Sequence, residues 1–498
     1  MGKQHRKFNS EESFVKFLKS RYGVQKDEEL EQLKSIDLAY TQMVTLPAEV
    51  GYLTNLESLK LHSSRVVHLP PEIGQLNNLR YLDLCASRVM KLPPEIGNLN
   101  KLQTLDLQSS VLTELPPEIG KLSSLNLLKL GNSRVETIPG EVNQLANLKT
   151  LDLGYSTNLP QNLKHFVHVE ALKLNSAYFE DLPIEVCELV NLKTLDLSQA
   201  NITSLPPEIG QLTNLEVLDL SYTKITTLPP EIGQLKHLHT LKLQCSRLIA
   251  IPPQIGHLTN LQTLDLGKTK VAKVPPEIGQ LSQLQSLSLN STLIEALPRD
   301  IWGVTELKFL NLNSTDIERL PPEVGHLTKL ESLHMHATWV EDLPDEITNL
   351  INLKHLELSH SNLIILPDEM GKLENLKSLG LQKTKIDRLP LSLGNLEKLV
   401  VIDISHTNIK GIPKELEHLP GLKFWRPAPK NKKNNSSYRP RVTKKPNYAP
   451  KGVELDVIVH LKTENHQEIE QAKRTLVLFI GELGFSIKRE KGSDSIPK

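Results

Sequence analysis

Residues 215–235 read LEVLDLSYTKITTLPPEIGQL, and this stretch decides the fold of the 498-residue chain. Variants of it recur every 23 residues, and most carry a Leu-Pro or Ile-Pro step. Five prolines from Pro47 to Pro139 keep this spacing, as do eleven from Pro183 to Pro413. Pro160 lies between the two runs and comes two positions early, so one of the seventeen units is shorter than the rest. A fixed period of this length predicts a solenoid of stacked repeats and not one compact core.

Each unit is predicted to supply one short strand and one helical turn. Leu218 and Leu220 should point into the core, because alternate residues of a strand face opposite sides. Asp219 and Ser221 should point outward. The strands of about seventeen units would then form a parallel β-sheet on the concave face of the solenoid. The Pro-Glu-Ile-Gly segment should start a helical turn, because proline suits the first position of a helix. The predicted fold class is α/β.

Thr or Ser stands at one position of most units, for example Ser64, Thr223 and Thr269. Backbone groups between adjacent turns of a solenoid would be buried without partners unless a polar side chain met them. We therefore interpret the hydroxyl column as a structural ladder between turns and not as a row of nucleophiles.

The repeats are flanked by segments with other patterns. Near the N-terminus, Phe14, Phe17 and Leu18 form one apolar stripe that can cover the exposed edge of the first repeat. After the repeats, a Lys-, Pro- and Asn-rich stretch has the composition of a disordered linker, and strand, helix and strand patterns follow it. The predicted domains are a helical N-terminal cap (1–35), the solenoid (36–425), a basic disordered linker (426–451) and a small β-α-β module (452–498).

Composition restricts the setting of the protein. Basic and acidic residues balance at 58 each, but residues 426–451 hold nine basic residues and no acidic one, so the rest of the chain is acidic overall. The three cysteines are too few for a disulfide framework. No apolar run reaches the roughly 18 residues that a membrane helix needs. These features predict a cytoplasmic protein that does not contact membranes.

The sequence holds no recognisable catalytic motif. Gly267-Lys268-Thr269 matches the end of a phosphate-binding loop, but Gln262 stands where that motif needs its first glycine. No HExxH or CxxC pattern occurs, and no Ser/His/Asp set can be recognised. We therefore expect no enzymatic activity, no cofactor and no resident metal.

The outward face of the strands carries the candidate protein-binding residues. Asp83 lies beside Asp106, and Asp196 lies beside Asp219, in neighbouring units. Such stacked like charges cost stability unless solvent screens them or a partner meets them. The aromatic residues on or beside the same surface are Tyr81, Tyr155, Tyr222 and Phe309. Acidic groups mixed with aromatic ones are typical of a protein-binding face.

Repeats 14 and 15 bring a second group of polar residues together. Its members are His334, His336, His355, His360, Glu357 and Trp339. Three interpretations stay open: a solvated polar patch, a partner contact that weakens between pH 7 and 5.5 as the imidazoles gain charge, or a metal site.

The segment LDLSYTKITTLPPEIGQL (218–235) resembles intracellular leucine-rich repeats of two groups. These are the Ras-interacting scaffold family and the repeat region of plant disease-resistance receptors, and the Thr/Ser column is more similar to the second. The resemblance covers residues 36–422 and implies a leucine-rich-repeat solenoid. Residues 452–498 resemble no family that we recognise.

These observations predict a cytoplasmic protein-binding scaffold or recognition subunit with a role in signalling. Its concave face would bind a protein partner. The alternative is a nucleic-acid-associated adaptor that uses the basic linker, residues 426–451. The open strand edges expected in residues 452–498 also predict self-association through that module.

Overall fold

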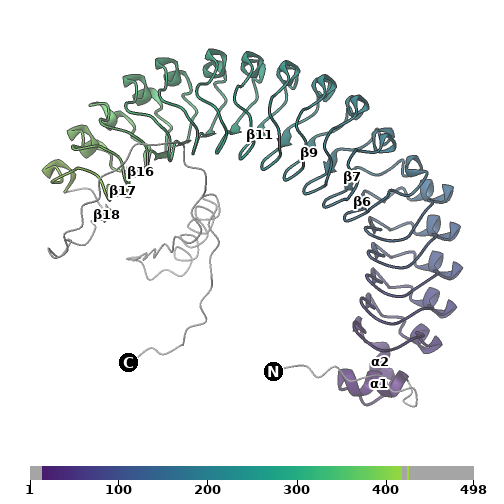
Figure 1. Ribbon diagram of the computed structural model, residues 1–498. Coiled ribbons are helices and arrows are strands. Elements are labelled where there is room, and N and C mark those ends of the chain that lie inside the picture. The colour runs from purple at the N-terminus through teal and green to yellow at the C-terminus, as the bar shows by residue number, and fades with distance from the viewer. Residues whose placement is uncertain (1–13, 418–422, 425–498) are drawn as a thin grey trace, which may run out of the picture. The chain divides into compact units, whose positions relative to one another are not determined.

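The computed structural model describes residues 14–417 and 423–424 of the chain. In this part each repeat contributes one strand and one short 3-10 helix, as the sequence predicts. The strands lie along the inner side of the repeats and the 3-10 helices along the outer side (Figure 1). The predicted linker (426–451) and β-α-β module (452–498) lie outside the described residues.

The described strands form one 18-stranded parallel sheet in which neighbours in sequence are neighbours in space. Leu218 pairs with Leu195 on one side and with Leu241 on the other, so the same position of each repeat forms a continuous column. The strands are β1 (Ser35–Asp37), β2 (Ser58–Lys60), β3 (Tyr81–Asp83), β4 (Thr104–Asp106), β5 (Leu127–Lys129), β6 (Thr150–Asp152), β7 (Ala171–Lys173), β8 (Thr194–Asp196), β9 (Val217–Asp219), β10 (Thr240–Lys242), β11 (Thr263–Asp265), β12 (Ser286–Ser288), β13 (Phe309–Asn311), β14 (Ser332–His334), β15 (His355–Glu357), β16 (Ser378–Gly380), β17 (Val401–Asp403) and β18 (Lys423–Phe424).

The 3-10 helices begin directly after the repeated proline. Pro229 has an extended backbone and Pro230 is the first residue of η9, where its missing N–H costs no hydrogen bond. Gly233 lies in the same helix, and a β-carbon there would come within 2.7 Å of the Gln254 carbonyl oxygen of the next repeat. The 3-10 helices are η1 (Ala48–Tyr52), η2 (Pro71–Gln75), η3 (Pro94–Asn98), η4 (Pro117–Lys121), η5 (Gly140–Gln144), η6 (Leu163–His165), η7 (Ile184–Glu188), η8 (Pro207–Gln211), η9 (Pro230–Gln234), η10 (Pro253–His257), η11 (Pro276–Gln280), η12 (Arg299–Gly303), η13 (Pro322–His326), η14 (Asp345–Asn349), η15 (Met370–Lys372), η16 (Leu391–Asn395) and η17 (Lys414–Leu416).

The core lies between the sheet and the 3-10 helices. Leu218 and Leu220 are fully buried, as the alternation predicts, and Asp219 is partly exposed. The outward orientation predicted for Ser221 is wrong, because this side chain is only 3% exposed. Ser221 follows the last strand residue by two positions, where the chain already turns back toward the core.

Backbone hydrogen bonds between repeats continue past each strand. In repeat 9 the N–H groups of Leu220 and Tyr222 donate to the carbonyls of Lys242 and Gln244, both at 2.8 Å. Tyr222 has a φ of 61°, in the left-handed region that side chains other than glycine adopt at a cost of roughly 1–2 kcal/mol. A residue of this kind follows every strand from β1 to β17, so the inter-repeat bonds hold a sharp turn at the same place in each unit.

Most of the hydroxyl bonds that the structure shows do not bridge adjacent turns as predicted, although Oγ of Ser156 does accept the N–H of Asn132 in the preceding repeat at 3.3 Å. The Oγ1 of Thr223 donates to the Leu220 carbonyl at 2.7 Å, within its own repeat, and Thr269 does the same to Leu266. Amide side chains before the strands make the bridges instead. Asn214 donates from Nδ2 to the Val190 carbonyl of the preceding repeat at 3.0 Å. The bridging amides are Asn55, Asn78, Asn147, Asn191, Asn214, Asn260, Asn352 and Asn375.

The short sixth repeat leaves the sheet intact. Leu151 of β6 pairs with Leu172 of β7 in the same register as the other strands. The shortening falls in the outer connection, where η6 has only three residues and Asn162 before it has a φ of 64°. The deletion therefore changes the outer side of the solenoid and not its strand face.

Two α-helices precede the first strand, as predicted for the cap. They are α1 (Phe14–Tyr22) and α2 (Asp27–Glu31). Phe14, Phe17 and Leu18 of α1 are buried in the same hydrophobic cluster as the first repeats. They cover apolar side chains of a repeat that has no preceding neighbour, which an uncapped solenoid would expose to water.

The buried leucine column makes a direct test of this fold. We expect Leu220→Asp to lower the free energy of unfolding by several kcal/mol, because it places an unpaired carboxylate between two neighbouring repeats. Thr226→Asp is the control, because Thr226 is an exposed residue of the same repeat. Urea denaturation followed by circular dichroism measures both. Equal midpoints for wild type and Leu220→Asp would show that the register is wrong.

Candidate protein-binding face

The structure separates the predicted binding residues into two groups. The first group lies in the strands, on the inner side of the repeats: Tyr81, Asp83, Asp106, Asp196, Asp219, Phe309, His334, His355 and Glu357. The second group lies in the turns and loops that follow the strands: Tyr155, Tyr222, His336, Trp339 and His360. The candidate surface is therefore a strand face together with the edge at the carboxyl ends of the strands.

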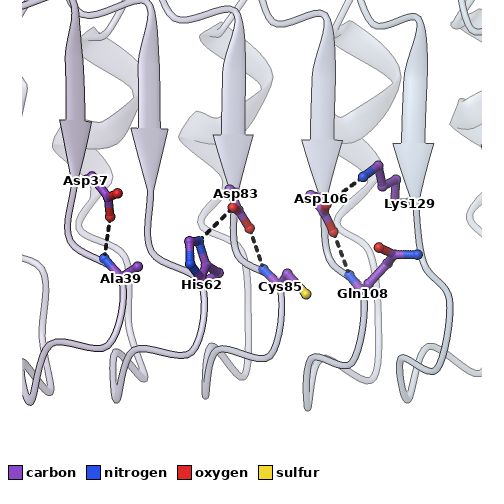
Figure 2. Close-up of polar contacts among 8 residues, drawn as sticks. All are labelled: Asp37, Ala39, His62, Asp83, Cys85, Asp106, Gln108 and Lys129. Carbon is purple, nitrogen blue, oxygen red and sulfur yellow. Dashed lines mark hydrogen bonds and ion pairs between the residues drawn. The ribbon is translucent and has the colours of Figure 1, made fainter. Parts of the chain in front are cut away.

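The outward aspartates of the first strands bond to other groups of the protein (Figure 2). The Asp83 carboxylate accepts the N–H of Cys85 at 3.0 Å and lies 2.9 Å from Nδ1 of His62. Asp106 accepts the N–H of Gln108 at 3.1 Å and pairs with Nζ of Lys129 at 2.9 Å. Only 7% of Asp83 and 5% of Asp106 is exposed. The stacked charges thus have partners in neighbouring repeats, and an external partner is not needed to offset them.

The second acidic pair, Asp196 and Asp219, has fewer partners within the protein. Asp196 and Asp219 face each other in paired strands, and each accepts the N–H of the residue two positions later. Lys242 of the next strand lies 3.5 Å from Asp219. Both carboxylates are partly exposed. A carboxylate that accepts this N–H closes the turn after the strand. The recurring Asp therefore has a structural role, although it lies on the outward face.

The strand face has far fewer charged residues after β11. From β1 to β11 every strand ends in Asp or Lys, whereas the outward residues of β12–β16 include neither Lys nor Arg and one acid, Glu357. We call these outward residues the neutral strip. They are Ser286, Ser288, Phe309, Asn311, Ser332, His334, His355, Glu357, Ser378 and Gly380. The serines and Asn311 were not among the predicted site residues, although the loss of charge after Asp265 is visible in the sequence.

Aromatic and imidazole rings pack closely in and beside the neutral strip. The rings of Phe309 and His334 meet edge to face with their centres 5.2 Å apart. Nδ1 of His355 lies 2.8 Å from Oγ of Ser378 in the next strand. At the edge, the rings of His336 and His360 are tilted against each other at 4.7 Å. These contacts hold the rings in fixed orientations.

Glu357 is the acid of the neutral strip, and it is only partly exposed. Its Oε1 accepts the N–H of Ser359 at 2.8 Å, and its carboxylate covers Gly380 of the next strand. A β-carbon at Gly380 would overlap that carboxylate. Burial raises the pKa of Glu357, which means that the surroundings disfavour its negative charge. Glycine at position 380 therefore gives Glu357 room to turn aside instead of projecting from the face.

Burial also keeps the histidines neutral near pH 7. It lowers the pKa of His334 to about 4, with a smaller contribution from His355. Burial, followed by His360 and Lys383, lowers the pKa of His336 to about 4 as well. The predicted protonation between pH 7 and 5.5 is therefore wrong for these two residues. Among the residues that the structure describes, no three His, Cys, Asp or Glu side chains are placed to hold a metal ion.

The remaining aromatic residues line the edge of the strand face. Tyr155 and Tyr222 occupy the left-handed turn after β6 and β9 and are about half exposed. Trp339 lies farther along the loop after β14, is 54% exposed, and donates from Nε1 to Asp316 at 3.2 Å. None of the three lies in a strand, so they are not part of the neutral strip.

Known proteins share this repeat and this fold. A family model described as "Leucine-rich repeat region" matches residues 72–117, 184–262, 231–302 and 295–379, and one described as "Leucine rich repeat" matches residues 100–159. A solved leucine-rich-repeat protein of Leptospira interrogans is 34% identical, covers 80% of this chain and 98% of its own, and has a TM-score of 0.64. The chain belongs to the leucine-rich-repeat family. The predicted family and fold are confirmed.

Two solved plant receptor kinases also resemble this leucine-rich-repeat protein. The Arabidopsis thaliana receptor kinase GASSHO1/SCHENGEN3, solved with Casparian strip integrity factor 2, is 26% identical over 79% of this chain and 55% of its own, with a TM-score of 0.50. The Arabidopsis receptor kinase HAESA, solved with the peptide hormone IDA and a co-receptor, is 25% identical over 78% of this chain and 74% of its own, also with a TM-score of 0.50. No curated protein matches the chain.

The lowered histidine pKa values predict how stability depends on pH. His334 and His336 bind protons less readily in the folded chain than in the unfolded chain, where the pKa is about 6.5. With respect to these two residues, the free energy of unfolding is therefore highest above pH 6.5. It decreases as the pH drops toward 4, because the unfolded chain then binds more protons than the folded chain. NMR titration of the imidazoles should place the midpoint of His334 near 4. A midpoint near 6.5 would show that His334 is not buried as described.

Proposed function

We propose that this protein is a non-enzymatic scaffold or recognition subunit whose neutral strip binds a protein partner. The observation that carries the proposal is the loss of Lys and Arg from β12–β16 on a face that holds fixed rings and partly exposed hydroxyl groups. The centres of protein interfaces are depleted of charged residues and enriched in aromatic ones. The neutral strip is depleted of charge in this way and holds Phe309 beside His334, whereas every strand of β1–β11 ends in Asp or Lys.

Desolvation explains why an uncharged partner segment fits best. A charged group that loses its water on binding needs a precise counter-charge, and the neutral strip offers only Glu357, whose carboxylate is turned over Gly380. Hydroxyl, amide and imidazole groups can instead donate to and accept from the backbone of an extended segment. HAESA was solved with the peptide hormone IDA, which is consistent with a peptide-like ligand for a solenoid of this family.

We infer a cytoplasmic setting and a role in signalling for the scaffold. All three cysteines are unpaired, which suits a reducing compartment. Within the described part of the chain, no helix has both the length and the apolar character to cross a bilayer. The nucleic-acid alternative and the self-association predicted for residues 452–498 both depend on segments outside the described residues, and they stay predictions from sequence.

A displayed random-peptide library selected against the full chain tests the proposed function. We expect enriched peptides to be poor in charged residues, because the neutral strip offers no counter-charge besides Glu357, which does not project from the face. Ser332→Glu, in β14, should weaken their binding about tenfold or more in fluorescence anisotropy, since it adds a charge at the centre of the contact. Thr240→Glu is the matched control, because it occupies the same position of the repeat in β10, outside the strip.

Comparing the two variants shows whether the peptides bind the neutral strip or another part of the strand face. Binding that Thr240→Glu weakens as much as Ser332→Glu would place the ligand elsewhere. Selection of strongly acidic or basic peptides alone would contradict the desolvation argument. Circular dichroism of both variants should match the wild type, because both side chains are partly exposed.

A further inference from the structure

The loops after the strands form an edge that carries charge in two blocks. In each repeat this loop edge consists of the left-handed turn residue and the five residues after it. The loops of repeats 9, 10 and 11 are residues 222–227, 245–250 and 268–273, and they contain five basic residues and no acidic one. These basic residues are Lys224, Arg247, Lys268, Lys270 and Lys273.

The next three loops carry the opposite charge. Residues 291–296, 314–319 and 337–342 are the loop edges of repeats 12, 13 and 14, and they contain five acidic residues and one basic residue, Arg319. The acidic residues are Glu295, Asp316, Glu318, Glu341 and Asp342. Within the described residues, none of the charged side chains in either block takes part in an ion pair. Like charges that stack in this way cost stability unless something of opposite charge meets them.

One column of the loop edge is self-complementary about its centre. It consists of the residue two positions after each left-handed turn, and from repeat 9 to repeat 15 it reads Lys224, Arg247, Lys270, Leu293, Asp316, Trp339 and Asn362. Leu293 is 53% exposed and lies at the midpoint. Lys270 and Asp316 lie one repeat to either side of it, and Arg247 and Trp339 lie two repeats to either side.

We propose that the loop edge of repeats 9–15 is an antiparallel contact surface for a second copy of this chain. A two-fold axis through repeat 12 would place Leu293 against Leu293 of the second copy. The same rotation places Lys270 against Asp316 of the second copy and Arg247 over the exposed face of its Trp339, a favourable cation–π arrangement. Each of these contacts occurs twice, because the interface is the same patch on both copies.

Charge and geometry both favour a second copy over another occupant. An acidic partner would meet the basic block and leave the acidic block stacked against itself. The rotation instead sets the basic loops of repeats 11 and 10 against the loops of repeats 13 and 14, which are acidic overall. It also sets Glu295 against Glu295 and Lys273 against Arg319, so the opposite charges outweigh the like charges at the level of whole loops. The rotation also lays the repeats of one copy along those of the other in reverse order. At ~4.8 Å per strand, the seven repeats give a contact roughly 30 Å long. Such a contact should weaken with added salt, because its rim charges are exposed.

Charge reversal in the full chain tests the proposal by sedimentation velocity at low ionic strength. Wild type should form a concentration-dependent dimer. Lys270→Glu and Asp316→Lys should each weaken it about tenfold or more, because each creates two like-charge contacts. An equimolar mixture of the two variants should dimerise again, because both contacts then join opposite charges. Glu318→Lys is a second acidic-block variant that leaves the Trp339–Asp316 hydrogen bond in place.

The matched control is Lys385→Glu, which occupies the same column in repeat 16, outside the contact. It should leave the dimer unchanged. A monomeric wild type at every concentration would overturn the proposal, as would a dimer insensitive to both reversals, which would point to residues 452–498. A mixture no tighter than either variant alone would also overturn it. Binding of poly-glutamate that is lost in Lys270→Glu, with no dimer in wild type, would identify an acidic protein segment as the occupant instead.

Discussion

The in-register pairing of each strand with the strand of the next repeat is the constraint on which the rest of this structure depends. It stacks Leu218 on Leu195 and Leu241, so that one buried position becomes a continuous apolar column. The same pairing supplies the inter-repeat hydrogen bonds that hold residues such as Tyr222 in a left-handed turn. A conformation that would be costly in one isolated turn is thereby stabilised in every repeat, because each turn is held by the next.

Stacking also turns every outward position into a column. Like charges in one column repel each other unless they are paired or absent. Over β1–β11 the protein meets this repulsion inside the sheet: Asp106 is paired with Lys129, Asp83 is paired with His62, and each carboxylate closes its own turn. Over β12–β16 the charges are absent, and Glu357 is folded over Gly380. The neutral strip is therefore the part of the strand face that presents uncharged hydrogen-bonding groups where β1–β11 present Asp and Lys.

Two polar columns run along the repeats, one of Thr and Ser and one of Asn, and their hydrogen-bond partners do not follow from the sequence of a single repeat. The Thr/Ser column lies at the position that suggested bridges between turns, yet Thr223 bonds its own repeat. Asn214 and its equivalents make the bridges from the other end of the strand. A recurring residue indicates that a position is constrained. It does not say which neighbour the side chain reaches, because a residue in a stacked array has one neighbour on each side as well as its own turn.

The sequence by itself determined the period, the number of repeats, the strand and helical turn of each unit, the leucine core and the apolar stripe of the cap. These follow from local rules, since alternation and proline placement act within a few residues and the period repeats them. Only the tertiary structure decided how exposed each column member is. His334 and Asp83 occupy equivalent outward positions, yet the first is a neutral imidazole and the second a carboxylate 2.9 Å from Nδ1 of His62, because different side chains of adjacent repeats cover them. Burial, pKa and charge pairing depend on residues of the neighbouring repeats, and a pattern read along one chain does not contain that packing.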